Sequence, residues 1–95
     1  MAEEFQTDFA ISTQKAEKLK ALAHPVRLCI VRGLMQSGSC NVTYMQGCLN
    51  LPQSTISQHL AKLRAARLIE GVRNGLEVYY RVVDEDVIRL IATLF

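Results

Sequence analysis

Tryptophan is absent from this 95-residue sequence, proline occurs only twice, and phenylalanine and tyrosine occur three times each. No apolar run approaches the roughly 18–20 residues that a membrane span needs. The N-terminus carries acids where a secretory signal carries bases, and no apolar core follows them. Three cysteines are an odd count, so a disulfide framework is not expected. These absences argue against a membrane or secreted protein and predict a cytoplasmic one.

Patterns for catalysis are also missing. The sequence has no glycine-rich phosphate loop and no His-Glu-x-x-His motif. Its two histidines are His24 and His59, and Ser57 lies too close to His59 in sequence for the two side chains to face each other on one helix. An enzyme needs a nucleophile with a base, or a metal with an open site. We therefore expect neither an enzyme nor a bound cofactor.

Charge is distributed unevenly along the chain. The net charge is only +2, and residues 1–10 carry acids without a base. Residues 62–73, in contrast, carry four bases against a single acid. With 49% hydrophobic residues, the chain suits one small domain that would gain burial from a dimer interface. The local excess of positive charge is typical of a surface that meets a polyanion.

Apolar spacing predicts four helices in the first two thirds of the chain. Residues 1–12 lack sustained periodicity and are expected to form a loose arm ahead of one domain over residues 13–95. Thr13 is the expected cap of the first helix, and Pro25 suits the first turn of the second. Asn50 is expected to close the third helix, since it tolerates a left-handed conformation. The expected helices span residues 13–22, 25–36, 42–49 and 53–66.

A β-hairpin and a last helix follow. Residues 68–73 and 76–82 are expected strands, joined at Asn74-Gly75, a pair that suits a turn in which both central residues have positive φ. Asp84 is expected to cap a helix over residues 85–94. The order α-α-α-α-β-β-α, with two short helices joined tightly before a hairpin, is typical of a winged helix-turn-helix. The predicted fold class is mainly α with a β-hairpin wing.

The expected helix over residues 53–66 carries the strongest functional signal. Ile56, Leu60 and Leu63 form an apolar seam that must face the core, which leaves hydroxyls, amides and bases on the outer face. A helix fits the major groove of duplex DNA, where Gln pairs with adenine and Ser or Thr bonds base edges or phosphates. The pattern therefore predicts that this helix binds double-stranded DNA.

The predicted DNA contacts fall into three groups. Lys62 and Arg64 are placed to meet phosphates, which makes binding salt-dependent. Arg73 and Asn74 lie at the expected tip of the wing, where Asn74 serves the turn whatever the function and only Arg73 argues for DNA. The residues expected nearest the bases and the adjacent phosphates are Gln53, Ser54, Thr55, Ser57, Gln58 and His59.

Three segments, taken in order and at their spacing, resemble the ArsR/SmtB family of winged-helix repressors. They are residues 22–31, which include Leu22-Ala23-His24-Pro25-Val26-Arg27-Leu28, residues 51–64 and residues 75–82. The resemblance implies a homodimer that forms through the first and last helices. It also implies repression, with two recognition helices in successive major grooves of an inverted-repeat operator.

The resemblance also identifies positions at which family members hold metals. The cysteine pair of one family site falls on Asn41 and Thr43, and neither supplies the thiolate that a soft metal needs. The start of the other site reads Asp84-Glu85-Asp86, with aspartate in place of histidine, and the later histidine pair does not occur before Phe95. Three or four ligands are normally required. We therefore expect neither standard metal site.

Two alternatives remain open. In the first, Cys29, Cys40 or Cys48 makes the repressor responsive to thiol oxidation or arsenite, and Arg32, one turn from Cys29, is expected to activate that thiol. In the second, the winged helix is a protein-interaction module that does not bind DNA. A third possibility lies within the main hypothesis: the protein senses nothing, and its concentration sets operator occupancy.

Overall fold

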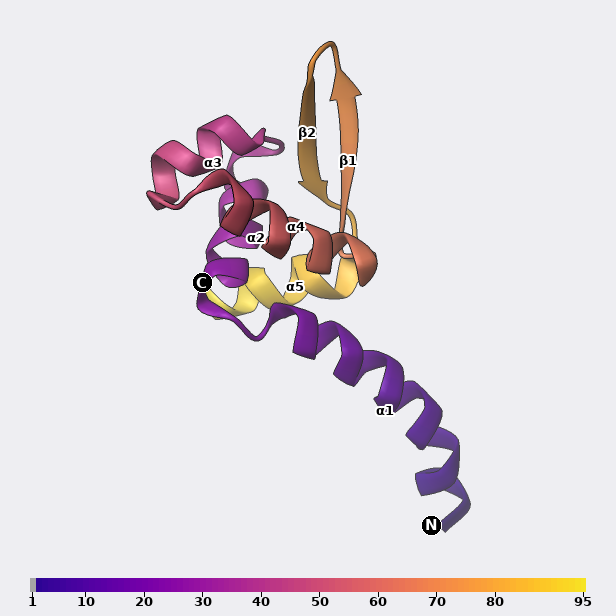
Figure 1. Cartoon of the computed structure of the whole chain (residues 1–95). Coiled ribbons are helices and arrows are strands. Elements are labelled where there is room, and N and C mark those ends of the chain that lie inside the picture. The colour runs from indigo at the N-terminus through magenta and orange to yellow at the C-terminus, as the bar shows by residue number, and fades with distance from the viewer. Residues whose placement is uncertain (1) are drawn as a thin grey trace.

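The computed structural model describes residues 2–95, with side chains from residue 8 onward. Two long helices come first, α1 (Ala2–Leu22) and α2 (Pro25–Ser37). The remaining elements are α3 (Val42–Leu49), α4 (Gln53–Ala65), β1 (Ile69–Asn74), β2 (Glu77–Val82) and α5 (Glu85–Leu94). The predicted order α-α-α-α-β-β-α is confirmed. In Figure 1, α1 extends away from the body at one end and the β1–β2 hairpin projects at the other.

The N-terminus differs from the sequence-based expectation. Residues 2–12, expected as an arm without regular structure, form the first half of α1, and residue 1 lies outside the described residues. Thr13 does not cap the helix; its hydroxyl donates to the carbonyl of Phe9 one turn earlier, a bond that Thr makes inside a helix. The assignment of residues 13–95 as a DNA-binding and dimerisation domain stays a prediction.

Caps set most of the other helix boundaries as the sequence predicts. Pro25 opens α2 after His24, whose Nδ1 accepts a hydrogen bond from the Val26 N–H. Asn50 closes α3 with φ 55°, in the left-handed region. Asp84 accepts from the Val87 N–H at 3.0 Å and so caps α5.

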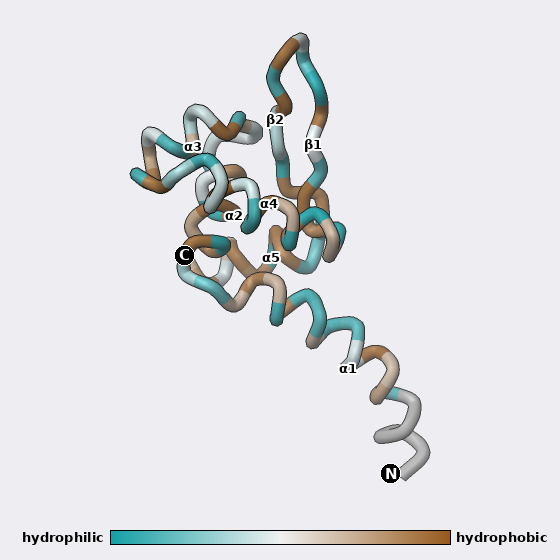
Figure 2. The backbone as a smooth tube through the Cα atoms, viewed as in Figure 1, coloured by the Kyte–Doolittle hydropathy of each residue, from teal (hydrophilic) through white to brown (hydrophobic). Residues whose placement is uncertain are grey.

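The core forms where α2, α4 and α5 cross beneath the hairpin, and the apolar stretches of the chain gather there in Figure 2. The predicted seam of α4 is confirmed, with Ile56 and Leu63 fully buried and Leu60 almost so. On α1, Leu22 is buried but Leu19 is 54% exposed. The buried core comprises Leu22, Ile30, Val31, Leu34, Met45, Ile56, Leu60, Leu63, Leu68, Ile69, Val87 and Ile91.

The hairpin turn lies one residue later than predicted. Asn74 pairs with Glu77 at the ends of the two strands, so the connecting residues are Gly75 and Leu76. Gly75 has φ 68°, whereas Asn74 has no positive φ, as in turns that need Gly at the first central position only. The prediction that Asn74 and Gly75 are both central turn residues is therefore wrong, and Asn74 ends β1 instead.

Candidate nucleic-acid interface

The outer face of α4 presents most of the predicted base-contacting residues together. Gln53, Ser54, Ser57 and Gln58 are exposed, while Thr55 is half-buried. Ser54 and Gln58 lie one turn apart, directly opposite the buried seam. Nothing acidic stands in the first turn of the helix. The face therefore offers neutral donors and acceptors at the helix end that reaches bases in helix-turn-helix proteins.

His59 points away from this face. Its ring lies against that of His24, with centroids 4.5 Å apart, and its Nδ1 is buried without a hydrogen-bond partner among the described residues. Burial lowers the pKa of His59, and the neighbouring positive groups of His24, Arg27 and Lys62 lower it further. His59 therefore packs as a neutral ring between α4 and α2, and its expected base contact stays an untested prediction.

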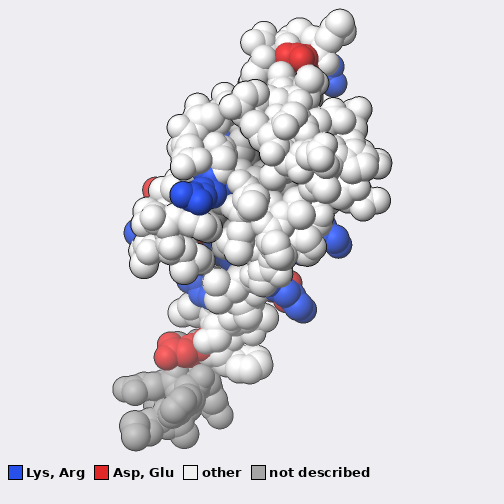
Figure 3. Space-filling view, turned by 90° about the vertical axis from the view of Figure 1, so that its left-hand side faces the viewer, with Lys and Arg blue, Asp and Glu red and all other residues white. Residues whose placement is uncertain are grey.

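The predicted phosphate-binding residues are exposed and not neutralised. Lys62 and Arg64 on α4 and Arg73 on β1 form no ion pair within the described part of the chain. The ion pairs that do form use the bases of α1, β2 and α5 instead. Figure 3 shows patches of Lys and Arg spread over the middle of one face, and the more prominent patches of Asp and Glu near the two ends of that face. Unpaired bases are available to a polyanion without first breaking an internal contact.

The wing is braced against α3 by contacts that sequence reasoning missed. Cys40 pairs with Tyr80 of β2 through two backbone hydrogen bonds of 3.1 and 2.9 Å. Asn41 caps α3 through its Oδ1, and its Nδ2 donates to a carboxylate oxygen of Glu77. The Tyr79 hydroxyl donates to the same oxygen at 3.0 Å. These contacts fix the wing relative to α3 and α4. The preference of Asn41 for helix caps is the one sequence signal that could have indicated any of them.

The carboxylates at the start of α5 are occupied by lysines from α1. Lys18 lies 2.8 Å from Asp84 and 2.9 Å from Asp86, and Lys15 also pairs with Asp86. Hydrogen bonds from Lys15 and then Lys18 hold the pKa of Asp86 well below its ordinary value. Burial raises the pKa of Asp84, but the bonds from Lys18 and from the Val87 N–H outweigh it and the net shift is downward. These carboxylates are therefore ionised and already neutralised by tethered cations.

Among the described side chains, no group of three or more His, Cys, Asp or Glu is placed to hold a metal ion. The three cysteines nevertheless line one cavity of about 80 Å³ between α2 and α3. Burial raises the pKa of the Cys40 thiol, and the neighbouring Cys48 raises it further, which is opposite to the shift that activates a thiolate. Arg32, which was expected to activate the Cys29 thiol, stacks its guanidinium on the Phe95 ring, 4.3 Å from the ring centroid.

No helix within the described residues is long and apolar enough to cross a membrane. Instead, two short helices in tandem, an exposed polar face on the second and a braced hairpin define a winged helix-turn-helix DNA-binding domain. The family described as "Helix-turn-helix domain" matches residues 22–72.

Comparison with known proteins places this domain within a narrower family. The chain is 49% identical over 67 residues to the transcriptional repressor PagR of Bacillus anthracis, which covers 70% of this chain and 67% of PagR. It is 43% identical over 75 residues to the transcriptional repressor SmtB of Mycobacterium tuberculosis, covering 79% of this chain and 55% of SmtB. The crystal structure of PagR superposes with a TM-score of 0.84, over 92% of this chain and 99% of that one, at 41% identity.

The chain belongs to the ArsR/SmtB family of winged-helix transcriptional repressors. The predicted family and fold are thereby confirmed, as is the prediction of a DNA-binding regulator rather than an enzyme.

Proposed function

We propose that this protein is a cytoplasmic repressor that binds an inverted-repeat operator as a homodimer, with α4 of each subunit in the major groove. The observation that carries the proposal is the outer face of α4, where Ser54 and Gln58 are exposed one turn apart and continue into the unpaired Lys62. Gln53, Thr55 and Ser57 flank the proposed reading edge. Lys62, Arg64, Arg73 and Asn74 contact the backbone on either side.

Exposed apolar side chains support the homodimer. Phe9 is 73% exposed and Ile11 51% exposed on α1, and Leu94 and Phe95 are mostly exposed at the end of α5. The outer half of α1 stands clear of the body and carries an apolar stretch (Figures 1 and 2). Large apolar groups that a single subunit leaves in water favour association, and a second copy offers the same surface in return. The proposed interface is therefore formed by α1 and α5.

We propose that no small-molecule or metal signal releases the protein from its operator. The α5 carboxylates are paired with Lys15 and Lys18, so we propose that occupancy follows the concentration of the protein. The thiol- or arsenite-responsive alternative is favoured by one observation, the convergence of all three cysteines on one cavity. Replacing Cys29, Cys40 and Cys48 together by serine distinguishes concentration control from thiol or arsenite response. If oxidant or arsenite weakens operator binding by the parent protein but not by this triple variant, the alternative is supported.

The test of DNA reading begins with an operator selected from randomised duplexes by the purified full chain. Gln58→Ala should lower affinity for that operator by about 1–3 kcal/mol while leaving binding to unrelated duplex nearly unchanged. Gln36→Ala is the matched control, because Gln36 is exposed on α2, outside the proposed interface. Equal effects of the two substitutions would refute the role of α4. A chain that selects no duplex and shows no salt-dependent binding would support the protein-interaction alternative.

A further inference from the structure

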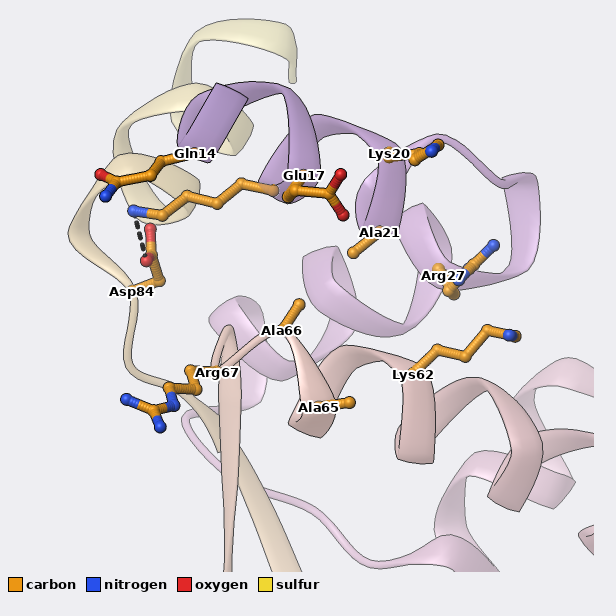
Figure 4. A pocket seen from close by; sticks show the side chains of 11 residues that line it. Gln14, Glu17, Lys20, Ala21, Arg27, Lys62, Ala65, Ala66, Arg67 and Asp84 are labelled. Atoms are coloured by element: carbon orange, nitrogen blue, oxygen red, sulfur yellow. Dashed lines mark ion pairs between the residues drawn. The ribbon is translucent and has the colours of Figure 1, made fainter. Parts of the chain in front are cut away.

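A broad open groove of roughly 930 Å³ runs between α1, the start of α2 and the C-terminal half of α4. Figure 4 looks into it. Five bases and two acids line it, so it carries a net positive charge. The bases are Lys18, Lys20, Arg27, Lys62 and Arg67, and the acids are Glu17 and Asp84.

The two ends of the groove differ in charge. At one end, Lys18 pairs with Asp84 and the charges cancel. At the other end lie Lys20, Arg27 and Lys62, each from a different helix, and none of them forms an ion pair among the described side chains. Their charged ends point to the same side in Figure 4, toward the N-terminal part of α4. Glu17 lies between the two ends in Figure 4 and forms no ion pair with any of the three bases. Three unpaired bases from three helices at one end of a groove favour an anionic ligand.

The region around Arg27 carries unpaired nitrogen atoms as well as charge. The Nε of Arg27 is buried without a hydrogen-bond partner, and the nearby His59 Nδ1 is likewise unpaired. Arg27 lies in the first turn of α2, which contains no acid. The N-terminal end of a helix carries a positive partial charge that attracts anions, and at α2 this charge persists although the Val26 and Leu28 N–H groups are bonded to His24. The guanidinium of Arg27 forms no ion pair among the described side chains, so its charge is available to an anion in the groove.

The open end of the groove continues the reading edge of α4. Lys62 lies one turn after Gln58, which itself lies one turn after Ser54. A duplex whose bases contact Ser54 and Gln58 would carry a sugar–phosphate strand across the end of the groove at Lys62. Arg27 and Lys20 lie next along the same end.

We propose that Lys20, Arg27 and Lys62 form a clamp for one phosphodiester strand of the operator, which brings α1 and α2 into the DNA interface. Arg27 is the central group, because its guanidinium can present two donors to one phosphate. The inference rests on the proposed function, in which α4 enters the major groove. Contacts to phosphate are independent of sequence, so the clamp strengthens binding to all duplexes alike.

The test is the salt dependence of duplex binding by the full chain. Lys20→Gln and Arg27→Gln should each reduce the slope of log affinity against log salt by about 1.8, the effect of losing one phosphate contact in each subunit of the proposed dimer. Affinity should fall equally on the selected operator and on unrelated duplex, so their ratio is preserved. Arg27→Lys keeps the charge and should retain the slope. Arg32→Gln is the matched control for loss of one unpaired base, since Arg32 stacks on Phe95 and does not line the groove. Because Phe95 lies in the proposed dimer interface, sedimentation first checks that this variant is as dimeric as the parent, and its slope should then equal that of the parent.

The outcomes separate the clamp from the function on which it depends. Parent-like slopes in both Lys20→Gln and Arg27→Gln, with operator binding retained, would overturn the clamp and leave the role of α4 intact. Absence of salt-dependent binding by the parent chain would overturn the proposed function itself. If Arg27→Gln fails to fold, Lys20→Gln decides alone, because Lys20 is exposed. Saturable binding of inorganic phosphate at constant ionic strength, lost in both variants while their DNA slopes stay parent-like, would assign the groove to a free anion instead.

Discussion

Gly71 lies where the wing has no room for a side chain. A Cβ at this position would lie 2.8 Å from Cγ1 of Val78 and 3.0 Å from Cε1 of Tyr80, both on the opposite strand. Tyr80 cannot withdraw freely, since its backbone also pairs with Cys40. Gly71→Ala should therefore force Val78 or Tyr80 out of its present rotamer and loosen the wing.

Two opposing terms set the size of this effect. Overpacking of this kind costs typically about 1–3 kcal/mol. Replacing a strand glycine with alanine returns about 0.5–1 kcal/mol of backbone entropy. The overpacking term is the larger, so we expect a net loss of up to about 2.5 kcal/mol in the free energy of unfolding. Gly33→Ala makes the same chemical change inside α2, where nothing lies within 4 Å of the added Cβ. Helix propensity then predicts a gain of about 1 kcal/mol.

Urea denaturation at one fixed protein concentration measures both variants, because the stability of a dimer depends on protomer concentration. A lower free energy of unfolding for Gly71→Ala and a higher one for Gly33→Ala, each relative to the parent, would support the reasoning. A Gly71→Ala protein as stable as its parent, alongside a stabilised Gly33→Ala protein, would show that the strand accommodates the methyl group and that the wing is not closely packed there. Gly71→Ala should also weaken operator binding, since it displaces the proposed backbone contacts of the wing.

The remaining predictions concern the ties between α1 and α5 and between α3 and the wing. Lys18→Gln removes one of the cations that hold the pKa values of Asp84 and Asp86 below 3.8. A carboxylate whose pKa is depressed in the folded state stabilises the fold at a pH above its unfolded pKa, and this contribution is lost as the pH falls through the folded pKa. The parent should therefore lose more stability than Lys18→Gln between about pH 5 and pH 2. Acid denaturation of the two proteins measures this difference. Asn41→Ala should cost about 1 kcal/mol by removing the α3 cap. Asn41→Asp should restore the cap, and hence most of that stability in urea denaturation, but its carboxylate cannot donate to Glu77, so amide exchange in the wing should stay faster than in the parent.

The sequence predicts a helix boundary well where a single residue satisfies the free backbone groups at the end of the helix. The bounds of α3 match the prediction because Asn41 and Asn50 satisfy the backbone groups at its two ends, whatever surrounds the helix. The start of α1 was not predictable in this way. Phe9 and Ile11 lie exposed on this helix, so the described side chains here show no core-facing periodicity that could mark its start.

The candidate site was predictable as a face but not as a set of contacts. The seam at Ile56, Leu60 and Leu63 dictates which residues of α4 face outward, and period alone is enough for that inference. The position of His59 depends instead on α2, which brings His24 within stacking distance from 35 residues earlier. Tertiary contacts of this kind leave no local trace in the sequence. The groove that joins Lys20, Arg27 and Lys62 is invisible to periodicity for the same reason.

The pairing of α1 with α5 bears on how this repressor is controlled. The resemblance to the ArsR/SmtB family places part of a metal site at Asp84 and Asp86, where a bound cation would compensate the carboxylates. Here Lys15 and Lys18 supply that compensation from the same chain. A tethered ammonium cannot dissociate as a metal ion can, and no change in external metal concentration alters its occupancy. The Lys15 and Lys18 contacts with the α5 carboxylates form with the fold itself. Because the proposed dimer interface uses the same two helices, we expect operator occupancy to follow the amount of protein and not the supply of a metal.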